Sequence, residues 1–229
     1  RDRLSWNALL HYATGSEAEA LASNAAQPSP PILEEMRQVE RWLRSIGAST
    51  VMPAKELYIR HAGNVIDVVQ PFSGAQMLAG GLPESEALGS FAYHFDVRGG
   101  IRGIGSKALE LGFNSVSFGL PTFNYGIRHA QLRTVPNLAV VSPGSGFTGL
   151  ASSAGRIVEF NVGVGQGIGI AAAIALEQNR PLASVTNQEV RAVLQATNRL
   201  PKLYGQGSQE SSLLARFEQA LATGGEAIA

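Results

Sequence analysis

The sequence predicts a mixed α/β fold, in which a β-sheet region flanked by helices is followed by a strand, a turn and a long helix. Three observations predict it. Hydrophobic residues make up 45% of the 229 residues, which is enough for a sizeable core. Some segments repeat apolar residues at helical spacing, whereas others are short β-branched or aromatic runs. Glycine accounts for 26 residues without low-complexity repeats, which indicates tight turns and closely packed backbone.

Charge and cysteine content exclude several classes of function. The 18 basic residues balance the 18 acidic ones, which argues against a nucleic-acid binder and against a polybasic membrane-surface protein. The chain has no cysteine, so disulfides, thiolate metal sites and cysteine nucleophiles are excluded. No apolar run reaches the 18 or so residues of a membrane span, so none is expected.

The start of the chain gives an expectation about processing. It begins at Arg1, and no signal-peptide pattern follows. We therefore expect an internal start within a longer protein. The compartment is not fixed by the sequence, and the cytoplasm is favoured.

The first half of the chain is predicted to contain a helical segment and then a sheet region. Residues 1–50 form the helical segment, whose clearest helix covers 32–46, with Gly47 as a left-handed C-cap. Residues 51–136 form the sheet region. Its predicted elements are a hairpin over 57–69 with its turn at 61–64, a strand over 91–97 and a strand over 113–118.

The second half is predicted to be a strand, a turn and a series of helices. Residues 137–180 contain a buried strand over 137–141, a Gly/Ser turn and one long helix from about Ser153 to Glu177. Residues 181–229 contain two more helices. These helices cover about 189–197, after a capping box at 186–189, and about 209–223, with Leu213, Leu214, Phe217 and Leu221 inward.

Two familiar motifs fail on spacing. The glycines at 163, 165, 167 and 169 lack the G-x-G-x-x-G spacing and lie inside a predicted helix, so close helix packing explains them better than a pyrophosphate site. None of the four histidines has the i, i+4 spacing of a helical zinc pair, so no metal site is predicted. His94 and Asp96 alternate on the predicted strand and share one face, either as a functional pair or as an ordinary polar face.

The segment from Ser142 to Ser153 is the strongest candidate site. A strand that runs through a small-residue turn into a helix start exposes backbone N–H groups at the positive end of the helix dipole, which suits an anion or an acceptor. Arg156 is an unusual residue so near a helix start and needs a carboxylate, phosphate or carbonyl partner. A salt bridge to Glu159, three residues on, is the simplest such partner.

This stretch resembles the C-terminal segment of a family of FAD-dependent oxidoreductases. N-L-A-V-V at 137–141, A-S-S-A-G-R-I-V at 151–158 and G-Q-x-x-G-x-A-A-A-I-A at 165–175 match that segment's strand, helix start and helix. Upstream, L-Y-I-R at 57–60, E-S-E-A-L-G-S at 84–90 and Y-H-F-D followed by R-G-G at 93–100 are similar to its substrate-side region. The similarity runs from about residue 51 to residue 176.

The resemblance implies a cofactor, a reaction and a set of residues. FAD would carry hydride transfer to or from a small organic substrate, while the protein supplies orientation and electrostatics. The last strand and long helix would belong to a Rossmann-like flavin domain. The implied flavin contacts, chiefly through backbone donors, are Ser142, Gly144, Ser145, Ser153, Gly155 and Arg156, and the implied catalytic, substrate-side residues are His94 and Arg98.

This sequence also departs from the family pattern. Ser142-Pro143 stands where the family has G-R, Thr148-Gly149 where it has T-H, and Ser153 where it has glycine. The family's G-x-G-x-x-G nucleotide-binding unit is not found in these residues, so the expected partners are an N-terminal part of the same protein or a second copy. The alternative is a non-catalytic binding or interaction module on this scaffold that has lost the cofactor. A hydrolase using Ser145 or Ser153 lacks a G-x-S-x-G elbow.

Overall fold

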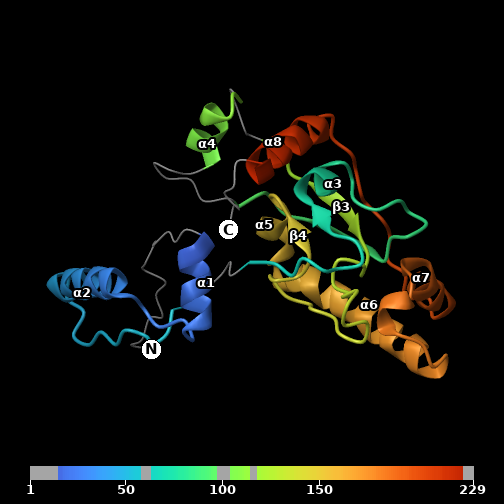
Figure 1. Cartoon of the computed structure of the whole chain (residues 1–229), viewed down its shortest axis with the longest axis horizontal. Helices are drawn as coiled ribbons and strands as arrows, with labels where there is room; N and C mark the ends of the chain where they lie inside the picture. Colours follow the sequence, from blue (N-terminus) through green and yellow to red (C-terminus); the bar gives the residue numbers. More distant parts are fainter. Residues whose placement is uncertain (1–14, 58–62, 97–103, 114–117, 224–229) are drawn as a thin grey trace. The chain divides into compact units, whose positions relative to one another are not determined.

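A computed structural model describes residues 15–57, 63–96, 104–113 and 118–223 (Figure 1). The chain divides into two compact units, residues 1–63 with Ala229, and residues 64–228. Each unit is described by itself. Short β-pairs and helices alternate along the chain, so the fold is mixed α/β.

The described part of the first unit contains two helices, α1 (Gly15–Ser23) and α2 (Pro30–Ser45). The predicted C-cap of α2 is confirmed. Gly47 has φ +104°, and the N–H groups of Gly47 and Ala48 donate to the carbonyls of Arg44 and Leu43. These two hydrogen bonds form a Schellman motif, which needs a residue that tolerates positive φ at the position of Gly47.

Two short β-pairs lie in the second unit. β1 (Phe72–Ser73) runs parallel to β4 (Phe147–Thr148). β2 (Gly89–Ala92) runs antiparallel to β3 (Thr122–Tyr125), with Phe91 opposite Phe123. Because β1 pairs with β4, segments 75 residues apart meet at one place.

Six α-helices and one 3₁₀ turn are described in the second unit. Their bounds are α3 (Gly74–Leu78), α4 (Ile104–Glu110), α5 (Ala151–Gly155), α6 (Val158–Glu177), η1 (Leu182–Ser184), α7 (Asn187–Ala196) and α8 (Ser211–Thr223). The capping box predicted before α7 is confirmed, since Thr186 and Glu189 bond each other's backbone N–H groups. Leu214, Phe217 and Leu221 of α8 are buried as predicted, but Leu213 is 40% exposed.

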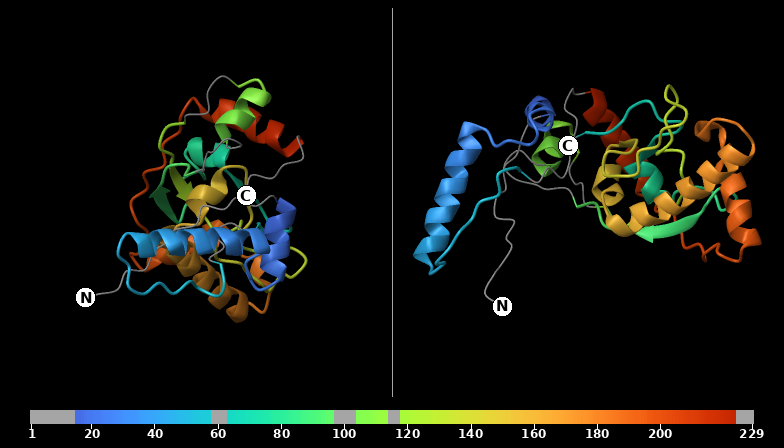
Figure 2. Two further views of the ribbon diagram at one scale, coloured as in Figure 1. Left: turned by 90° about the vertical axis from the view of Figure 1, so that its left-hand side faces the viewer. Right: turned by 90° about the horizontal axis from the view of Figure 1, so that it is seen from below.

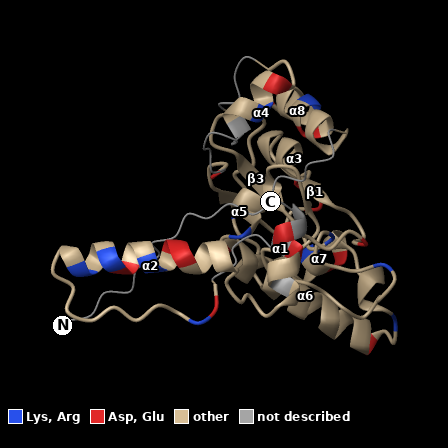
Figure 3. Ribbon diagram, turned by 60° about the vertical axis from the view of Figure 1, so that its left-hand side comes forward, with Lys and Arg blue, Asp and Glu red and all other residues tan. Residues whose placement is uncertain are grey.

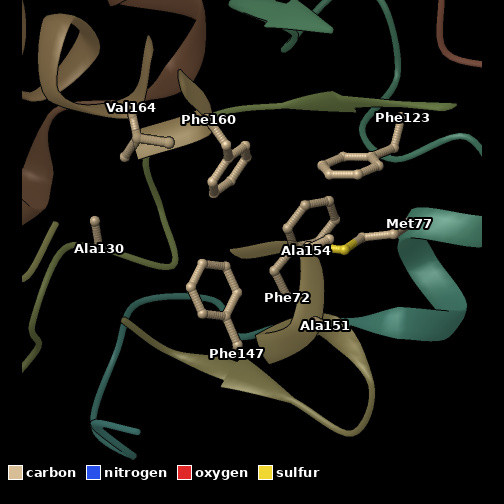
Figure 4. Close-up of a cluster of buried hydrophobic side chains, with 9 residues drawn as sticks. All are labelled: Phe72, Met77, Phe123, Ala130, Phe147, Ala151, Ala154, Phe160 and Val164. Carbon is tan, nitrogen blue, oxygen red and sulfur yellow. The ribbon is translucent and has the colours of Figure 1, made fainter. Parts of the chain in front are cut away.

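The second unit is held by three buried clusters. The central cluster joins the β-pairs to α5 and the start of α6 through Phe72, Phe123, Phe147 and Phe160 (Figure 4). A second cluster joins the rest of α6 to η1 and α7, and a third joins α8 to α3 and the 150 region. α6 contributes side chains to the first two clusters and so connects them. Its ribbon runs from yellow to orange in Figure 2.

The hairpin prediction over 57–69 is wrong for its second arm. Residues 58–62 lie outside the described part of the chain, and residues 63–69 form no strand. Val65 N–H donates to Gly144 O, and Val69 N–H donates to Gln131 O. Long-range pairing with 128–146 therefore takes the hydrogen bonds that a local hairpin would use.

Three other element predictions also need correction. The strand expected over 91–97 ends at Ala92, and that expected over 113–118 lies mostly outside the described residues. Residues 137–141 form no strand, because this segment makes only an isolated bridge, Ala139 with Gln131. Leu138 is 46% exposed, so the segment is not buried either.

The long helix predicted from Ser153 is two helices. α5 ends at Gly155, Ile157 is extended with ψ 134°, and α6 begins at Val158. Asn161 fixes this break, because its side-chain N–H group donates to the carbonyls of Gly155 at 2.6 Å and Ile157 at 2.9 Å. The side chain thus satisfies the carbonyls that the interrupted helix leaves free.

Among the described helices, α6 is long and apolar enough by composition to cross a membrane, with a mean hydropathy of 1.3. One face of α6 packs into the core through Phe160, Val164 and Ala171. A single such helix that also packs into a core gives no clear membrane span in the described chain.

Two glycines of α6 offer a matched test of its packing. A Cβ at Gly167 would come within 2.6 Å of Ile127 Cγ2, whereas a Cβ at Gly169 would meet nothing within 4 Å. We expect Gly169→Ala to raise the free energy of unfolding by about 0.5–1 kcal/mol, because alanine favours helix. We expect Gly167→Ala to lower it by about 1–3 kcal/mol, because the core must shift. Denaturant unfolding of both variants measures the difference, and equal effects would contradict this packing.

Candidate cofactor and substrate site

The Gly/Ser turn uses its own hydrogen-bond donors. Ser142 N–H donates to Ser145 Oγ, Gly144 N–H to Ser142 Oγ, and Ser145 N–H to Ser142 O, at 3.0–3.2 Å. Ser145 is fully buried, and its hydroxyl donates to Val140 O at 2.5 Å. The backbone donors expected to face a flavin at this turn are therefore already bonded within it.

Asn64 fixes the same turn from outside. Its side-chain N–H group donates to Pro143 O at 3.0 Å and Ser145 O at 2.8 Å. Its Oδ1 accepts from the Ser152 hydroxyl at 3.1 Å. One side chain therefore joins the turn to α5, and nothing in the sequence pattern identified it.

The carboxylate of Glu218 lies at the starts of two helices. Its Oε1 accepts from Gly74 N–H at 3.0 Å and from Leu150 N–H at 2.8 Å, and its Oε2 accepts from Ala75 N–H at 3.1 Å. Gly74 opens α3 and Leu150 is the N-cap of α5. The amides at the start of α5 are therefore capped by a side chain of the same chain, Glu218 of α8, and are not free for the flavin that the sequence predicted to face them.

Two glycines make room for this carboxylate. A Cβ at Gly74 or at Gly149 would collide with the Glu218 side chain, and Gly149 also has φ +55°. Burial raises the pKa of Glu218, and the three amide hydrogen bonds oppose that rise without cancelling it.

Arg156 lies at the break between α5 and α6, and its partner is Asp96. The two side chains form an ion pair in which that of Arg156 is 11% exposed and that of Asp96 is 31% exposed. The guanidinium also lies over the Tyr93 ring, 5.9 Å from its centroid. The expected pairing with Glu159 is thus replaced by one across the fold, which sequence spacing could not reveal.

The break leaves polar atoms without a partner. Arg156 Nε and Asn161 Oδ1 are both buried and unbonded among the described residues. Ile157 has no side chain that could cap α6, so the N–H groups of Val158 and Glu159 have no acceptor within the helix. A donor side chain and a positive helix end therefore occur together at the break.

The structure describes one of the two candidate substrate-side residues, His94. His94 is exposed and stacks on Tyr93 with ring centroids 4.5 Å apart. Arg98 lies outside the described residues. Ser153 and Gly155 are buried in α5, where the Ser153 hydroxyl donates to Leu150 O at 2.7 Å.

His129 is a buried histidine inside the aromatic cluster. It is 3% exposed, and its ring centroid lies 5.0–5.8 Å from those of Phe72, Phe147 and Phe160. Nε2 has no hydrogen-bond partner in the described part of the chain. Burial lowers the pKa of His129 to about 3.

A shallow hollow borders His129 and Arg128. Its lining residues are Gln70, Pro71, Phe72, Leu82, Gly126, Arg128 and His129. Its cavity volume is about 10 Å³, far below the roughly 300–1,000 Å³ of typical small-molecule sites. The described residues also hold no group of three or more side chains that could bind a metal ion.

Comparisons with protein-family models, with curated proteins and with solved structures found no match to this chain.

The turn and the helix break differ in whether their hydrogen-bond donors are already used. The donors of the Ser142–Ser145 turn are engaged, so they do not fit in this conformation. Arg156 Nε has no acceptor among the described residues, but it is buried, so a ligand would reach it only after neighbouring side chains moved. The first amides of α6 have no acceptor within the helix. FAD carbonyl oxygens are acceptors of the kind these donors need.

Glu218 provides a test of the two helix starts. Glu218→Ala leaves three amide donors unsatisfied, so we expect the free energy of unfolding to fall by about 2–4 kcal/mol. Glu218→Gln keeps the acceptor for Gly74 and Leu150 and loses that for Ala75, so it should cost less. Denaturant unfolding at neutral pH measures both. An alanine variant as stable as the wild type would contradict this role.

His129 gives a pH-dependent prediction. The folded-state pKa lies near 3 and the unfolded value near 6.5, so the unfolded state binds the proton first as the pH falls below 6.5. The stability of the fold should therefore decrease with acidification, by about 2 kcal/mol between pH 7 and pH 5. His129→Phe suits the aromatic surroundings and removes this contribution. Denaturant unfolding at pH 7 and pH 5 should show that the wild type loses about 2 kcal/mol more stability on acidification than His129→Phe does. Equal losses of stability in the two proteins would contradict the prediction.

Proposed function

We propose that this chain is the substrate-side and flavin-capping half of an FAD-dependent oxidoreductase, which transfers hydride between a small organic substrate and the flavin. The finer assignment of residues 137–180 to a Rossmann-like flavin domain is part of the proposal. It draws on the sequence resemblance and on one structural observation, the large apolar side chains on both sides of α6.

The exposed side of α6 carries large apolar residues beside polar ones such as Glu159 and Gln166. Its inner face is in the core, yet Val158, Val162 and Leu176 are 72%, 67% and 83% exposed. Large exposed apolar side chains on a helix whose other face is in a core suit a further protein layer. A nucleotide-binding sheet laid against this outer face would supply the missing layer and the binding of the FAD pyrophosphate.

The break before α6 is where the proposal puts the flavin contact. Arg156 would donate to a carbonyl of the flavin pyrimidine ring, and the first amides of α6 would stabilise negative charge there through the helix dipole. Asp96 and Tyr93 hold the guanidinium in place. When bound, FAD supplies the hydride chemistry. His94 and Arg98 are the proposed substrate-side residues.

Flavin fragments test which part of the cofactor this half would bind. FMN and FAD should raise the melting temperature of the protein at millimolar concentration, whereas ADP should not, because the proposed contact is to the flavin ring. Arg156→Gln should abolish the shift by FMN. Arg199→Gln, an exposed arginine beyond α7, is the matched control and should leave the shift unchanged.

The second candidate function is a non-catalytic interaction module that has lost the cofactor. The observation that favours it is that the backbone N–H groups of the turn and of the α5 start already donate to side chains, those of Ser142, Ser145 and Glu218. Under this alternative neither FMN nor FAD shifts the melting temperature, and the purified protein shows no flavin absorbance near 450 nm. That pair of results would overturn the oxidoreductase proposal.

A further inference from the structure

The connection between α7 and α8 covers residues 197–210 (Figure 1). Within it the structure has one isolated β-bridge, between Gln206 and Thr122, and no helix or strand. Connections of this length without regular structure are uncommon in a compact domain and are typically lids or binding loops. Its central part, residues 203–208, is called the strap below.

The strap covers a polar pair on β2 and β3. Ser90 and Asn124 lie opposite each other in the two strands, and the Ser90 hydroxyl donates to Asn124 Oδ1 at 2.7 Å. Asn124 is 5% exposed. The N–H groups of Tyr204 and Gly205 donate to Ser90 Oγ at 2.7 Å and to Asn124 Oδ1 at 2.9 Å. Two strap amides therefore occupy acceptors of this pair.

Backbone hydrogen bonds are the main attachment of the strap. Two further N–H groups, those of Gln206 and Ser208, donate to the carbonyls of Thr122 and Leu78, both at 2.8 Å. None of the strap side chains is fully buried, and Tyr204 is 63% exposed. The strap contains no charged residue, so it is tan in Figure 3 and no ion pair holds it.

The helices on either side of the strap are held by buried apolar side chains instead. Val190 and Leu194 of α7 belong to one core cluster, and Leu214 and Phe217 of α8 belong to another. Segments with few buried apolar contacts open at a lower free energy than the elements that carry the core. The strap is therefore the part of this region that can open while both helices stay in place.

Glycines allow the strap to lie close to the backbone beneath it. A Cβ at Gly205 would lie 2.5 Å from Asn124 Cγ and 2.5 Å from Gly80 O, and a Cβ at Gly207 would lie 2.9 Å from Ala79 O. A larger residue at position 205 must displace the strap or its neighbours, which is destabilising. A single substitution there changes how well the strap closes.

We propose that the strap is a lid that opens as one unit, without unfolding α7 or α8, and so controls access to the Ser90–Asn124 pair. Opening breaks the four strap hydrogen bonds together. It leaves Ser90 Oγ and Asn124 Oδ1 as acceptors for amide N–H groups of the kind that Tyr204 and Gly205 supply when the strap is closed. The proposal does not involve the flavin and is tested separately from the proposed oxidoreductase function.

Hydrogen exchange of the whole chain, followed by NMR, tests the proposal first. The four strap amides should show similar protection factors, at least about ten-fold below those of Leu214, Phe217 and Leu221 in α8, because local opening costs less than global unfolding. Their exchange should not respond to low urea concentrations, since local opening exposes little surface. Protection and urea dependence equal to those of α8, or protection factors that differ widely among the four amides, would overturn the proposal.

Gly205→Ala tests whether closure depends on the close approach of the strap. We expect the protection of the four strap amides to fall about ten-fold, because the added Cβ must displace the strap, while the amides of Val190 in α7 and Leu214 in α8 keep theirs. Gly169→Ala is the matched control, since its Cβ meets nothing within 4 Å, and should leave strap exchange unchanged. An equal fall in the strap and in both helices would show that the strap opens only when the whole unit unfolds, which contradicts the proposal.

Discussion

The second unit depends on one carboxylate, that of Glu218. It accepts three backbone N–H groups at the starts of α3 and α5, which are separated in sequence by more than 70 residues. Two helix starts bring partial positive charge to this point, and a buried amide without an acceptor is costly. α8 is thereby fixed to the turn at Gly149, and the buried face of α8 adds its apolar packing to the same junction. α8 therefore helps to position the start of α5, which lies within the stretch that the sequence resemblance singled out.

The sequence predicted those elements whose signals are local. The cap at Gly47 and the capping box at Thr186 depend on neighbouring residues, and both were found. The second arm of the hairpin at 57–69 was wrong, because Val65 and Val69 take backbone partners far along the chain. The strand at 137–141 was wrong, because Ala139 makes only an isolated bridge with Gln131. Of the site, the helix start was predicted as a place for a ligand, but its amides are capped by Glu218 of the same chain. A glutamate on an amphipathic helix 68 residues later resembles any solvated residue.

Tertiary contacts also explain why the break between α5 and α6 was not predicted. No proline or turn motif marks an end near Arg156, so the sequence predicts one continuous helix there. The interruption is stabilised by tertiary contacts: Asn161 bonds the freed carbonyls, and Asp96 holds the arginine. An ion pair between residues 60 positions apart has no signature in the sequence. This is why the simplest sequence pairing, with Glu159, was the wrong one.

These features divide the candidate site into a turn whose hydrogen-bond donors are already used and a helix break that has an unsatisfied donor. At the turn, Ser142, Ser145 and Asn64 satisfy one another, so a ligand there would have to replace existing hydrogen bonds with equivalent ones and would gain little. At the break, the Arg156 Nε donor is buried and has no acceptor among the described residues. A ligand carbonyl that reached it after a local rearrangement would satisfy an unsatisfied donor, which stabilises more than exchanging one hydrogen bond for another. If this chain contacts a flavin, the energetics therefore favour the helix break over the glycine- and serine-rich turn, although the turn carries the more familiar motif.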